Sequence, residues 1–371
     1  MLNEKEFEFL GIARWHEKGY KGRNVIIASR ENVLNVFNDV EAYTFEKSPT
    51  EWAKHGTNVM DYIRQVAPDA RKITFEFHGV MDEIFTSPHS KYILDIVPDI
   101  LTTSLFNSEY KGYPLKFYTT LYKQDCFLTC AAGNSGDSGV RQLAQGDMWK
   151  AIGACRYNKG KPKVTSYSSK GEELDFVSFD HLIAKWSGYA NDGTSFSVPL
   201  FASMLALVQS FFIEKTGHKL NNDELMNFAI DNTIDLDKDG KDIKSGYGLF
   251  VLPDPDTIDV FKYTKPIVME DVFQFLQDKG ELLEPSYWQE QIQREDKFKW
   301  LFIKWANAVR FSRGLAKNQN EIYDYNVEPI LNWLHNNGYL YEPDYWITKI
   351  LKEPKLRWMF YKWYNAINRV R

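Results

Sequence analysis

Cysteine is scarce in this chain: Cys126, Cys130 and Cys155 are the only three among 371 residues. An odd and sparse count argues against a framework of disulfides. Two of the three stand in apolar, strand-like runs, where a buried free thiol is the ordinary interpretation. This usage favours a reducing compartment, and we expect a cytoplasmic protein.

The chain also lacks a long apolar run and a strong excess of either charge. No uninterrupted apolar stretch reaches the roughly 18 residues that cross a bilayer. The start, MLNEKEFEFLGIARWHEKGY, is charged early and has no small-residue cleavage site, so we expect neither a membrane partner nor a secretory signal. The formal net charge of −5 gives no reason to expect nucleic acid as a partner.

Sequence motifs that indicate a metal site are scarce as well. No cluster of Cys and His indicates zinc. The stretch DLDKDGKD has the spacing of a calcium loop through Asp235, Asp237 and Asp239. Its twelfth position is Gly246, which cannot supply the bidentate carboxylate that such loops use. A polar surface hairpin is therefore the favoured interpretation, and we expect no cofactor.

What the sequence does have is a series of short apolar runs separated by helical patterns. Short buried strands that alternate with helices predict an α/β fold, a parallel sheet with helices on both faces. Active sites of such sheets lie at the carboxyl ends of the strands. The runs at 25–28, 73–77, 100–106, 126–132 and 150–155 indicate strands, and the patterns at 58–66, 90–98 and 196–212 indicate helices.

The stretch CAAGNSGDSG at 130–139 contains two conflicting signals. GDSG is typical of the nucleophile loop of trypsin-like enzymes, with Ser138 attacking. AAGNSG is typical of an oxyanion-binding loop, with Asn134 donating a hydrogen bond. Val140 follows GDSG where the trypsin motif has a further glycine, and no regular series of short strands predicts a barrel. We therefore discard Ser138 and keep Asn134.

Three segments in a fixed order carry a family resemblance: KHGTNVMDYIRQVAPDA (54–70), CAAGNSG (130–136) and GTSFSVPLFASMLALV (193–208). Together they resemble the histidine, oxyanion and nucleophile motifs of the subtilisin-like serine proteases. The later SGYGLF (245–250) resembles the closing segment of that family, so the resemblance covers roughly residues 18–255. It implies a three-layer subtilisin-like α/β domain that hydrolyses peptide bonds.

The resemblance implies a role for each matching residue. Ser195 is the expected nucleophile, His55 its base, and Asn134 with the Ser195 N–H the oxyanion donors. Acyl transfer needs such a nucleophile and base, together with a group that orients the base. Ser195 also opens a predicted buried helix, whose free N–H groups favour developing negative charge. Taken singly, each motif could equally be a helix cap or a structural histidine.

A substrate-binding strand is implied upstream. TSLF (103–106) resembles the Ser-Leu-Gly strand with which the family pairs substrate backbone and lines its S1 pocket. Phe106 stands where the family has glycine, so we expect a narrowed pocket. The substrate-binding positions implied in all are Ser104, Leu105, Phe106, Gly133, Gly193 and Thr194.

The orienting acid is where the sequence departs from the family pattern. In GRNVIIASRENV (22–33), alignment of the opening glycine with that of the family places Glu31 on the family's aspartate. A glutamate can hold the imidazole tautomer too, given a backbone shift that absorbs its extra methylene. The family's Thr-Gly after the acid is missing, so two alternatives stay open. One is Asp39, which stands closer in sequence to His55, and the other is no acid at all.

From Phe261 onward the chain carries an internal repeat with a constant offset of 58 residues. FLQDKGELLEPSYWQEQI (275–292) returns as WLHNNGYLYEPDYWITKI (333–350), and KWLFIKWANAVR returns as RWMFYKWYNAIN. In each unit we expect one helix that ends at the glycine and a second that begins at the proline. A third helix carries Trp and Phe at helical spacing. Two such small bundles could stack.

These patterns predict three parts: a peptidase domain over 1–260 and helical repeats over 261–314 and 315–371. The repeats resemble, less specifically, units that end various phage and Gram-positive bacterial proteins. Exposed aromatic rings would make 261–371 a docking or self-association module. Alternatively, the Trp residues are the core of each repeat.

We therefore predict an intracellular serine endopeptidase with a Ser-His-Glu triad, acting on a protein or peptide substrate. Residues 1–20 are too short for the folded pro-domain that secreted members of the family carry, so control would act through the repeats or a partner. The alternative is a catalytically silent or partner-activated protein that uses a protease fold for binding.

Overall fold

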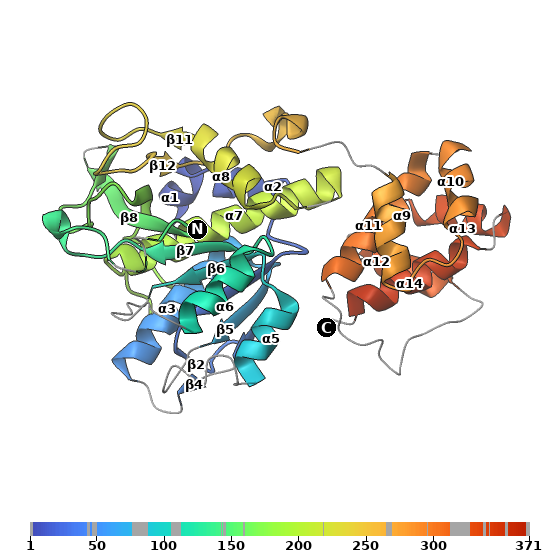
Figure 1. The fold of residues 1–371 in the computed structure, drawn as a ribbon, viewed down its shortest axis with the longest axis horizontal. Helices are drawn as coiled ribbons and strands as arrows, with labels where there is room; N and C mark the ends of the chain where they lie inside the picture. Colours follow the sequence, from blue (N-terminus) through green and yellow to red (C-terminus); the bar gives the residue numbers. More distant parts are fainter. Residues whose placement is uncertain are drawn as a thin grey trace. The chain divides into compact units, whose positions relative to one another are not determined.

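This computed structural model describes residues 3–42, 45–46, 50–75, 88–104, 113–141, 143, 146–158, 160–217, 219–264, 269–294, 296–311, 327–336, 339–340, 342–352 and 355–368. The chain divides into two compact units, each shown in Figure 1. The first comprises Met1–Lys215 and Lys219–Thr264, and the second comprises Lys265–Arg371 with Thr216–His218.

The first unit is built on a ten-stranded sheet with the order β11-β12-β10-β8-β7-β6-β1-β5-β3, in which β9 also pairs with β8. The strands run parallel except where β11 pairs with β12 and β8 with β9. The strands of this sheet are β1 (Ile26–Arg30), β3 (Val40–Ala42), β5 (Arg71–Phe75), β6 (Ile100–Thr103), β7 (Phe127–Ala131), β8 (Trp149–Asn158), β9 (Lys161–Val164), β10 (Leu174–Phe179), β11 (Thr233–Ile234) and β12 (Leu249–Phe250). A separate pair consists of β2 (Val33–Leu34) and β4 (Phe45–Glu46).

The central strands have every side chain buried, as in β1, β6 and β7. Burial on both faces explains why their sequences are continuous apolar runs, and their prediction as parallel strands is confirmed. β10 is equally buried, yet its sequence pattern does not predict a strand. Its polar residues hid the pattern: the carboxylate of Asp175 accepts a hydrogen bond from the Ala151 N–H at 2.9 Å and pairs with Lys241 at 3.2 Å.

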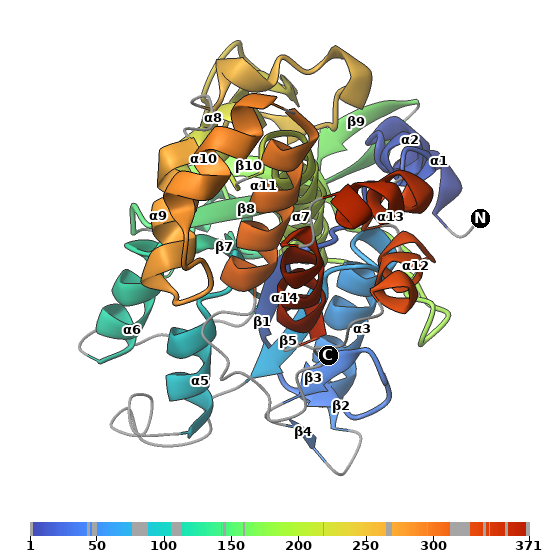
Figure 2. The same ribbon diagram turned by 90° about the vertical axis from the view of Figure 1, so that its right-hand side faces the viewer.

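Helices pack around this sheet, and both views show α5 beside α6 (Figures 1 and 2). Those of the first unit are α1 (Glu4–Phe9), α2 (Ile12–Glu17), α3 (Glu51–Val66), α5 (Pro88–Ile96), α6 (Tyr113–Tyr122), α7 (Thr194–Thr216) and α8 (Asn222–Asp231), with short 3₁₀ turns at Gly136–Ser138, Pro255–Thr257 and Val260–Lys262.

Helix α7 is the core helix predicted from the run at 196–212. Phe201 stacks on Phe176 of β10 with ring centres 4.9 Å apart, and Phe212 packs on Phe228 of α8. By length and composition α7 could cross a membrane, but 94% of its most apolar window is buried inside the protein. Its hydrophobicity is therefore used in the core of the first unit.

The second unit contains two sets of three helices. The first set is α9 (Met269–Asp278), α10 (Pro285–Arg294) and α11 (Asp296–Phe311), and the second is α12 (Glu328–Asn336), α13 (Pro343–Lys352) and α14 (Leu356–Asn368). Gly280 follows α9 with a φ of +65°, a conformation that glycine adopts without strain. The repeats share one hydrophobic core, in which Trp288, Trp305, Trp346 and Trp363 are at most 5% exposed.

Polar contacts between the two sets come in equivalent pairs. Lys297 binds Glu342 at 2.5 Å, and Lys355 binds Glu284 at 2.6 Å. The offset of 58 residues relates the two pairs: Lys355 is the repeat equivalent of Lys297, and Glu342 is the repeat equivalent of Glu284. The same holds for Lys304, which donates to the Tyr339 carbonyl, and Lys362, which donates to the Glu281 carbonyl. The two repeats therefore contact each other reciprocally, as the subunits of a two-fold dimer do.

Candidate active site

Predicted site residues follow the carboxyl ends of three neighbouring strands. Glu31 follows β1, Ser104 follows β6, and Asn134 stands three residues beyond β7. β6 lies between β1 and β7, whereas β5 pairs with the other side of β1. The strand order therefore reverses beside β1, and open parallel sheets form their ligand sites at such a point.

Glu31 and His55 face each other within this site. The Glu31 side chain is fully buried, and its Oε1 accepts a hydrogen bond from the Ser104 N–H at 2.7 Å. Its Oε2 lies 3.5 Å from His55 Nδ1, and neither of these two buried atoms has a hydrogen-bond partner. The separation is longer than a normal hydrogen bond, but catalytic hydrogen bonds often tighten when substrate binds.

Helix α3 carries His55 inside its second turn rather than before its start. The helix begins at Glu51 because the Thr50 hydroxyl caps it, accepting a hydrogen bond from the Ala53 N–H at 3.1 Å. The sequence pattern predicts this helix over 58–66, with His55 before it, and this predicted boundary is wrong. The apolar periodicity is weak at the start of α3 because Trp52 and Ala53 are its only apolar side chains before Val59, and Trp52 is exposed.

The two residues after His55 explain how α3 reaches the acid. A Cβ at Gly56 would lie 2.0 Å from the carbonyl oxygen of Asn32, so only glycine lets the helix approach this segment. The Thr57 hydroxyl accepts a hydrogen bond from the Leu34 N–H at 2.9 Å. Two contacts therefore clamp the chain just after the acid against the helix that carries the histidine.

Asp39, the alternative acid, has other partners. It binds Arg64 Nε at 2.7 Å and lies 3.4 Å from Lys72 Nζ. Burial raises the pKa of Asp39, but the hydrogen bond from Arg64 and the two cationic charges outweigh it and hold the pKa below its usual range. The structure therefore places Glu31, and not Asp39, against His55.

Ser195 is the second residue of α7 and is 8% exposed. The Ser104 hydroxyl donates to the Ser195 carbonyl at 2.7 Å, and Ser195 Oγ lies 3.5 Å from the Ser104 carbonyl oxygen. Ser104 also contacts Glu31 through its N–H. It thus joins the end of β1 to the start of α7, a linking position that the sequence did not reveal.

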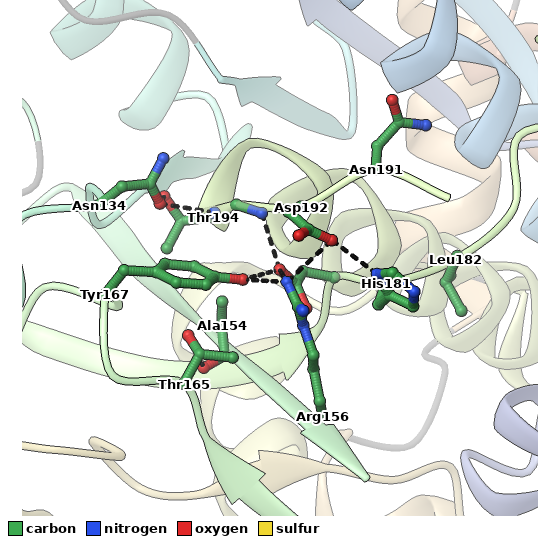
Figure 3. Close-up of polar contacts among 12 residues, drawn as sticks. Asn134, Ala154, Arg156, Thr165, Tyr167, His181, Leu182, Asn191, Asp192 and Thr194 are labelled. Carbon is green, nitrogen blue, oxygen red and sulfur yellow. Dashed lines mark hydrogen bonds and ion pairs between the residues drawn. The ribbon is translucent and has the colours of Figure 1, made fainter. Parts of the chain in front are cut away.

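Asn134 is exposed, and its side chain is held at one end (Figure 3). Its Oδ1 accepts hydrogen bonds from the Thr194 N–H at 2.9 Å and from the Thr194 hydroxyl at 3.0 Å. A backbone N–H can only donate, so this contact fixes which end of the amide is oxygen. The Nδ2 donor is therefore the end of Asn134 that remains available.

Gly133 and Gly193 adjoin this contact. The Gly133 N–H donates to the Thr194 hydroxyl at 3.1 Å, and both glycines have φ above +100°. Of the other implied substrate-binding positions, Leu105 and Phe106 lie outside the described residues, so the predicted narrowing of the pocket stays a prediction.

Ser138 and the calcium-loop candidates Asp235, Asp237 and Asp239 are exposed. Ser138 ends a short 3₁₀ turn. In the acidic stretch Asp237 pairs with Lys244 at 2.9 Å, while Asp242 accepts hydrogen bonds from the N–H groups of Lys244 and Ser245. No group of three or more His, Cys, Asp or Glu side chains that could hold a metal occurs among the described residues.

The three cysteines are free and buried, as expected. Burial raises the pKa of the Cys130 and Cys155 thiols well above the usual value. Because the thiolate is the reactive form, these side chains act as small apolar residues.

One charged residue beside the site, Asp180, is not predicted by any sequence motif. Asp180 follows β10 directly, is fully buried, and binds Arg156 through both carboxylate oxygens, at 2.7 and 2.9 Å. It also accepts a hydrogen bond from the Gly193 N–H at 2.7 Å. A lone Asp between Phe and His carries no motif, so only the tertiary structure could reveal it.

No protein-family model matches this sequence, and no curated protein matches it either. Solved structures do match. A lanthipeptide protease has a TM-score of 0.51 at 18% identity, covering 67% of this chain and 94% of that chain. The prenylagaramide maturation protease PagA has a TM-score of 0.54 at 16% identity, covering 69% and 99%. Sphericase has a TM-score of 0.52 at 20% identity, covering 63% and 93%.

The fold is subtilisin-like. The predicted fold class, a subtilisin-like α/β sheet followed by a helical C-terminal region, is therefore confirmed. At identities this low a shared fold does not by itself establish a shared activity.

Proposed function

We propose that this protein is a serine endopeptidase in which Ser195, His55 and Glu31 act as the triad. The observation that carries the proposal is the pairing of Glu31 Oε2 with His55 Nδ1 at 3.5 Å, where neither atom has a hydrogen-bond partner. Burial of a carboxylate costs several kcal/mol unless it is paired. An imidazole that becomes positively charged during catalysis provides that pairing.

In the proposed reaction the Ser195 hydroxyl attacks the carbonyl carbon of the scissile bond while His55 Nε2 accepts its proton. Glu31 holds the proton on Nδ1 and stabilises the imidazolium that forms. The tetrahedral intermediate collapses, the C–N bond breaks, and His55 protonates the leaving amine. Water then attacks the acyl-enzyme by the same route, with His55 as its base, and releases the acid.

The oxyanion is stabilised by Asn134 Nδ2 together with the N–H of Ser195. Support comes from Thr194, whose two hydrogen bonds hold Oδ1 and leave Nδ2 as the donor that can face the substrate. Helix α7 begins at Thr194, so the N–H groups of its first turn have no acceptor within the helix. Loss of one oxyanion donor costs about 3–4 kcal/mol of transition-state stabilisation.

The substrate is a peptide or protein, and the free, buried cysteines support an intracellular location. The second unit is a docking or control module in this proposal. Leu283 is 83% exposed and Trp358 is 50% exposed on its surface, beside a cavity of about 690 Å³ that Trp288 and Trp305 also line.

A second candidate function is binding without catalysis, or catalysis only after a partner binds. The 3.5 Å separation of Glu31 and His55 also fits partner-dependent catalysis, because a contact of this length becomes a hydrogen bond only when binding shortens it.

Labelling with a fluorophosphonate probe tests the endopeptidase. The wild-type protein is expected to form a covalent adduct, and Ser195→Ala is expected to form none. Ser138→Ala is the matched control, since it removes the serine of GDSG and should leave labelling intact. Folded wild-type protein that is never labelled would overturn the proposal, and labelling only after addition of a candidate partner would favour the second function.

A further inference from the structure

The buried carboxylate of Asp180, next to the oxyanion loop, accepts hydrogen bonds from several donors. Asp180 accepts hydrogen bonds from Arg156 Nε and Nη2, from the Tyr167 hydroxyl and from the Gly193 N–H. Figure 3 shows the side chains of Arg156, from β8, and Tyr167 pointing toward the same place, beside the segment that leads from Asp192 to Thr194. Burial and the charge of Asp180 raise the pKa of Tyr167 to about 12, so its hydroxyl stays a donor.

The contacts continue from Asp180 to the oxyanion donor without a break. Asp180 holds the N–H of Gly193, Thr194 follows in the chain, and Thr194 holds the oxygen of Asn134 twice. A Cβ at Gly193 would lie 3.1 Å from Asn134 Nδ2, so this backbone runs directly beside the amide. A shift of Gly193 would therefore displace the donor.

A structural role alone does not need a charge at this position. Any carbonyl oxygen could accept the Gly193 N–H, whereas a buried ion pair contributes little net stability and is often replaceable by apolar residues. The geometry of the Asp180–Arg156 pair is rigid, however, because a bidentate arginine fixes the plane of the carboxylate. Arg156 also neutralises a charge that would otherwise oppose the oxyanion.

We propose that Asp180 is a positioning residue for the oxyanion hole: with Arg156 and Tyr167 it fixes Gly193 and, through Thr194, directs Asn134 Nδ2. This inference rests on the proposed endopeptidase function. Asn134 is the group that touches the reacting oxygen, and Asp180 acts only through it.

The test measures the second-order rate constant of fluorophosphonate labelling in the full-length protein. In Asp180→Asn one of the groups that donate to the carboxylate would face an amide NH₂, which cannot accept its hydrogen bond. We expect labelling to slow roughly 10- to 100-fold. Asn134→Ala should slow it by about 10²- to 10³-fold. In the double variant the Asp180→Asn loss should largely disappear, since the group it positions is gone. A merely structural residue would give losses that multiply.

Asp175→Asn is the matched control. Asp175 lies on the adjoining strand β10, is also buried, and also accepts a backbone N–H and pairs with a cation, but it binds Ala151 and Lys241 instead of the oxyanion loop. Its labelling rate per folded molecule should match the wild type. Tyr167→Phe removes a single donor to Asp180 and should slow labelling several-fold even if Asp180→Asn does not fold.

The outcomes separate the two proposals. Wild-type protein that does not label defeats the endopeptidase itself. Wild-type labelling together with Asp180→Asn and Tyr167→Phe rates equal to that of Asp175→Asn overturns only the positioning role. Full multiplication of the Asp180→Asn and Asn134→Ala losses also overturns it.

Discussion

At the residue scale, the proton on His55 depends on which group faces Nδ1. In Glu31→Gln the side-chain oxygen would keep the Ser104 N–H, leaving an NH₂ group opposite Nδ1. That donor forces the ring proton onto Nε2, the nitrogen that accepts the serine proton in the proposed mechanism. We expect turnover and fluorophosphonate labelling to fall by about 10³- to 10⁴-fold, as a wrong tautomer does in other triads.

Asp39→Asn is the comparison for this substitution. The Asp39 side chain is 45% exposed but faces the buried Lys72 ammonium, so its loss should cost about 1–3 kcal/mol of stability and leave labelling per folded molecule unchanged. If Asp39→Asn abolished labelling while Glu31→Gln retained it, the assignment of the acid would be reversed.

At the scale of elements, helix α3 is held against the segment after β1 by the missing side chain at Gly56. Gly56→Ala would put a Cβ 2.0 Å from the Asn32 carbonyl oxygen, so the helix or the segment must move. We expect a loss of about 1–3 kcal/mol in the free energy of unfolding and a larger fractional loss of labelling, because His55 moves with the helix.

Denaturant unfolding and labelling rates measure both effects. Gly146→Ala serves as the control, since its nearest neighbour would be 3.9 Å from the new Cβ. Equal stability of the two alanine variants would show that α3 does not need this close approach.

The docking of α2 on the end of α3 should make stability depend on pH. His16 Nε2 donates to the Val66 carbonyl at 2.7 Å, and burial lowers the His16 pKa below 6.5, outweighing that hydrogen bond. Below pH 6.5 the unfolded chain therefore binds more protons at His16 than the folded chain, and stability is lost as the pH falls through the folded pKa.

His16→Gln keeps a donor but does not titrate, so its free energy of unfolding should fall less between pH 7 and pH 5 than that of the wild type. Denaturant titrations at several pH values measure this difference. Parallel curves for the two proteins would mean that His16 contributes nothing to acid sensitivity.

At the scale of the whole molecule, the two repeats form one cooperative unit because they share a core. Trp363→Ala removes a side chain that is 3% exposed and should cost about 3–5 kcal/mol. Hydrogen exchange should then lose protection in α9–α11 as much as in α12–α14, while β1, β6 and β7 keep theirs. Trp358→Ala, at a half-exposed position, should change little. Loss confined to α12–α14 would mean that each repeat is stable alone.

Sequence patterns predicted the central strands and α7 because continuous burial requires continuous apolar runs. They failed for β10, where Asp175 is buried but paired, and for the start of α3, where few apolar residues precede Val59. Local composition does not show whether a polar side chain has a hydrogen-bond or ion-pair partner far along the chain. For the same reason no pattern pointed to Asp180.

The sequence by itself determined the α/β architecture, the candidate residues Ser195, His55 and Asn134, and the repeat of 58 residues. It left Glu31 and Asp39 as competing acids, because alignment along the chain does not measure distance across it. Only the tertiary structure brought Glu31 to His55 and Asp180 to Gly193. Both contacts join residues from separate elements, and only the packing of α3 and α7 against the ends of the sheet brings such residues together.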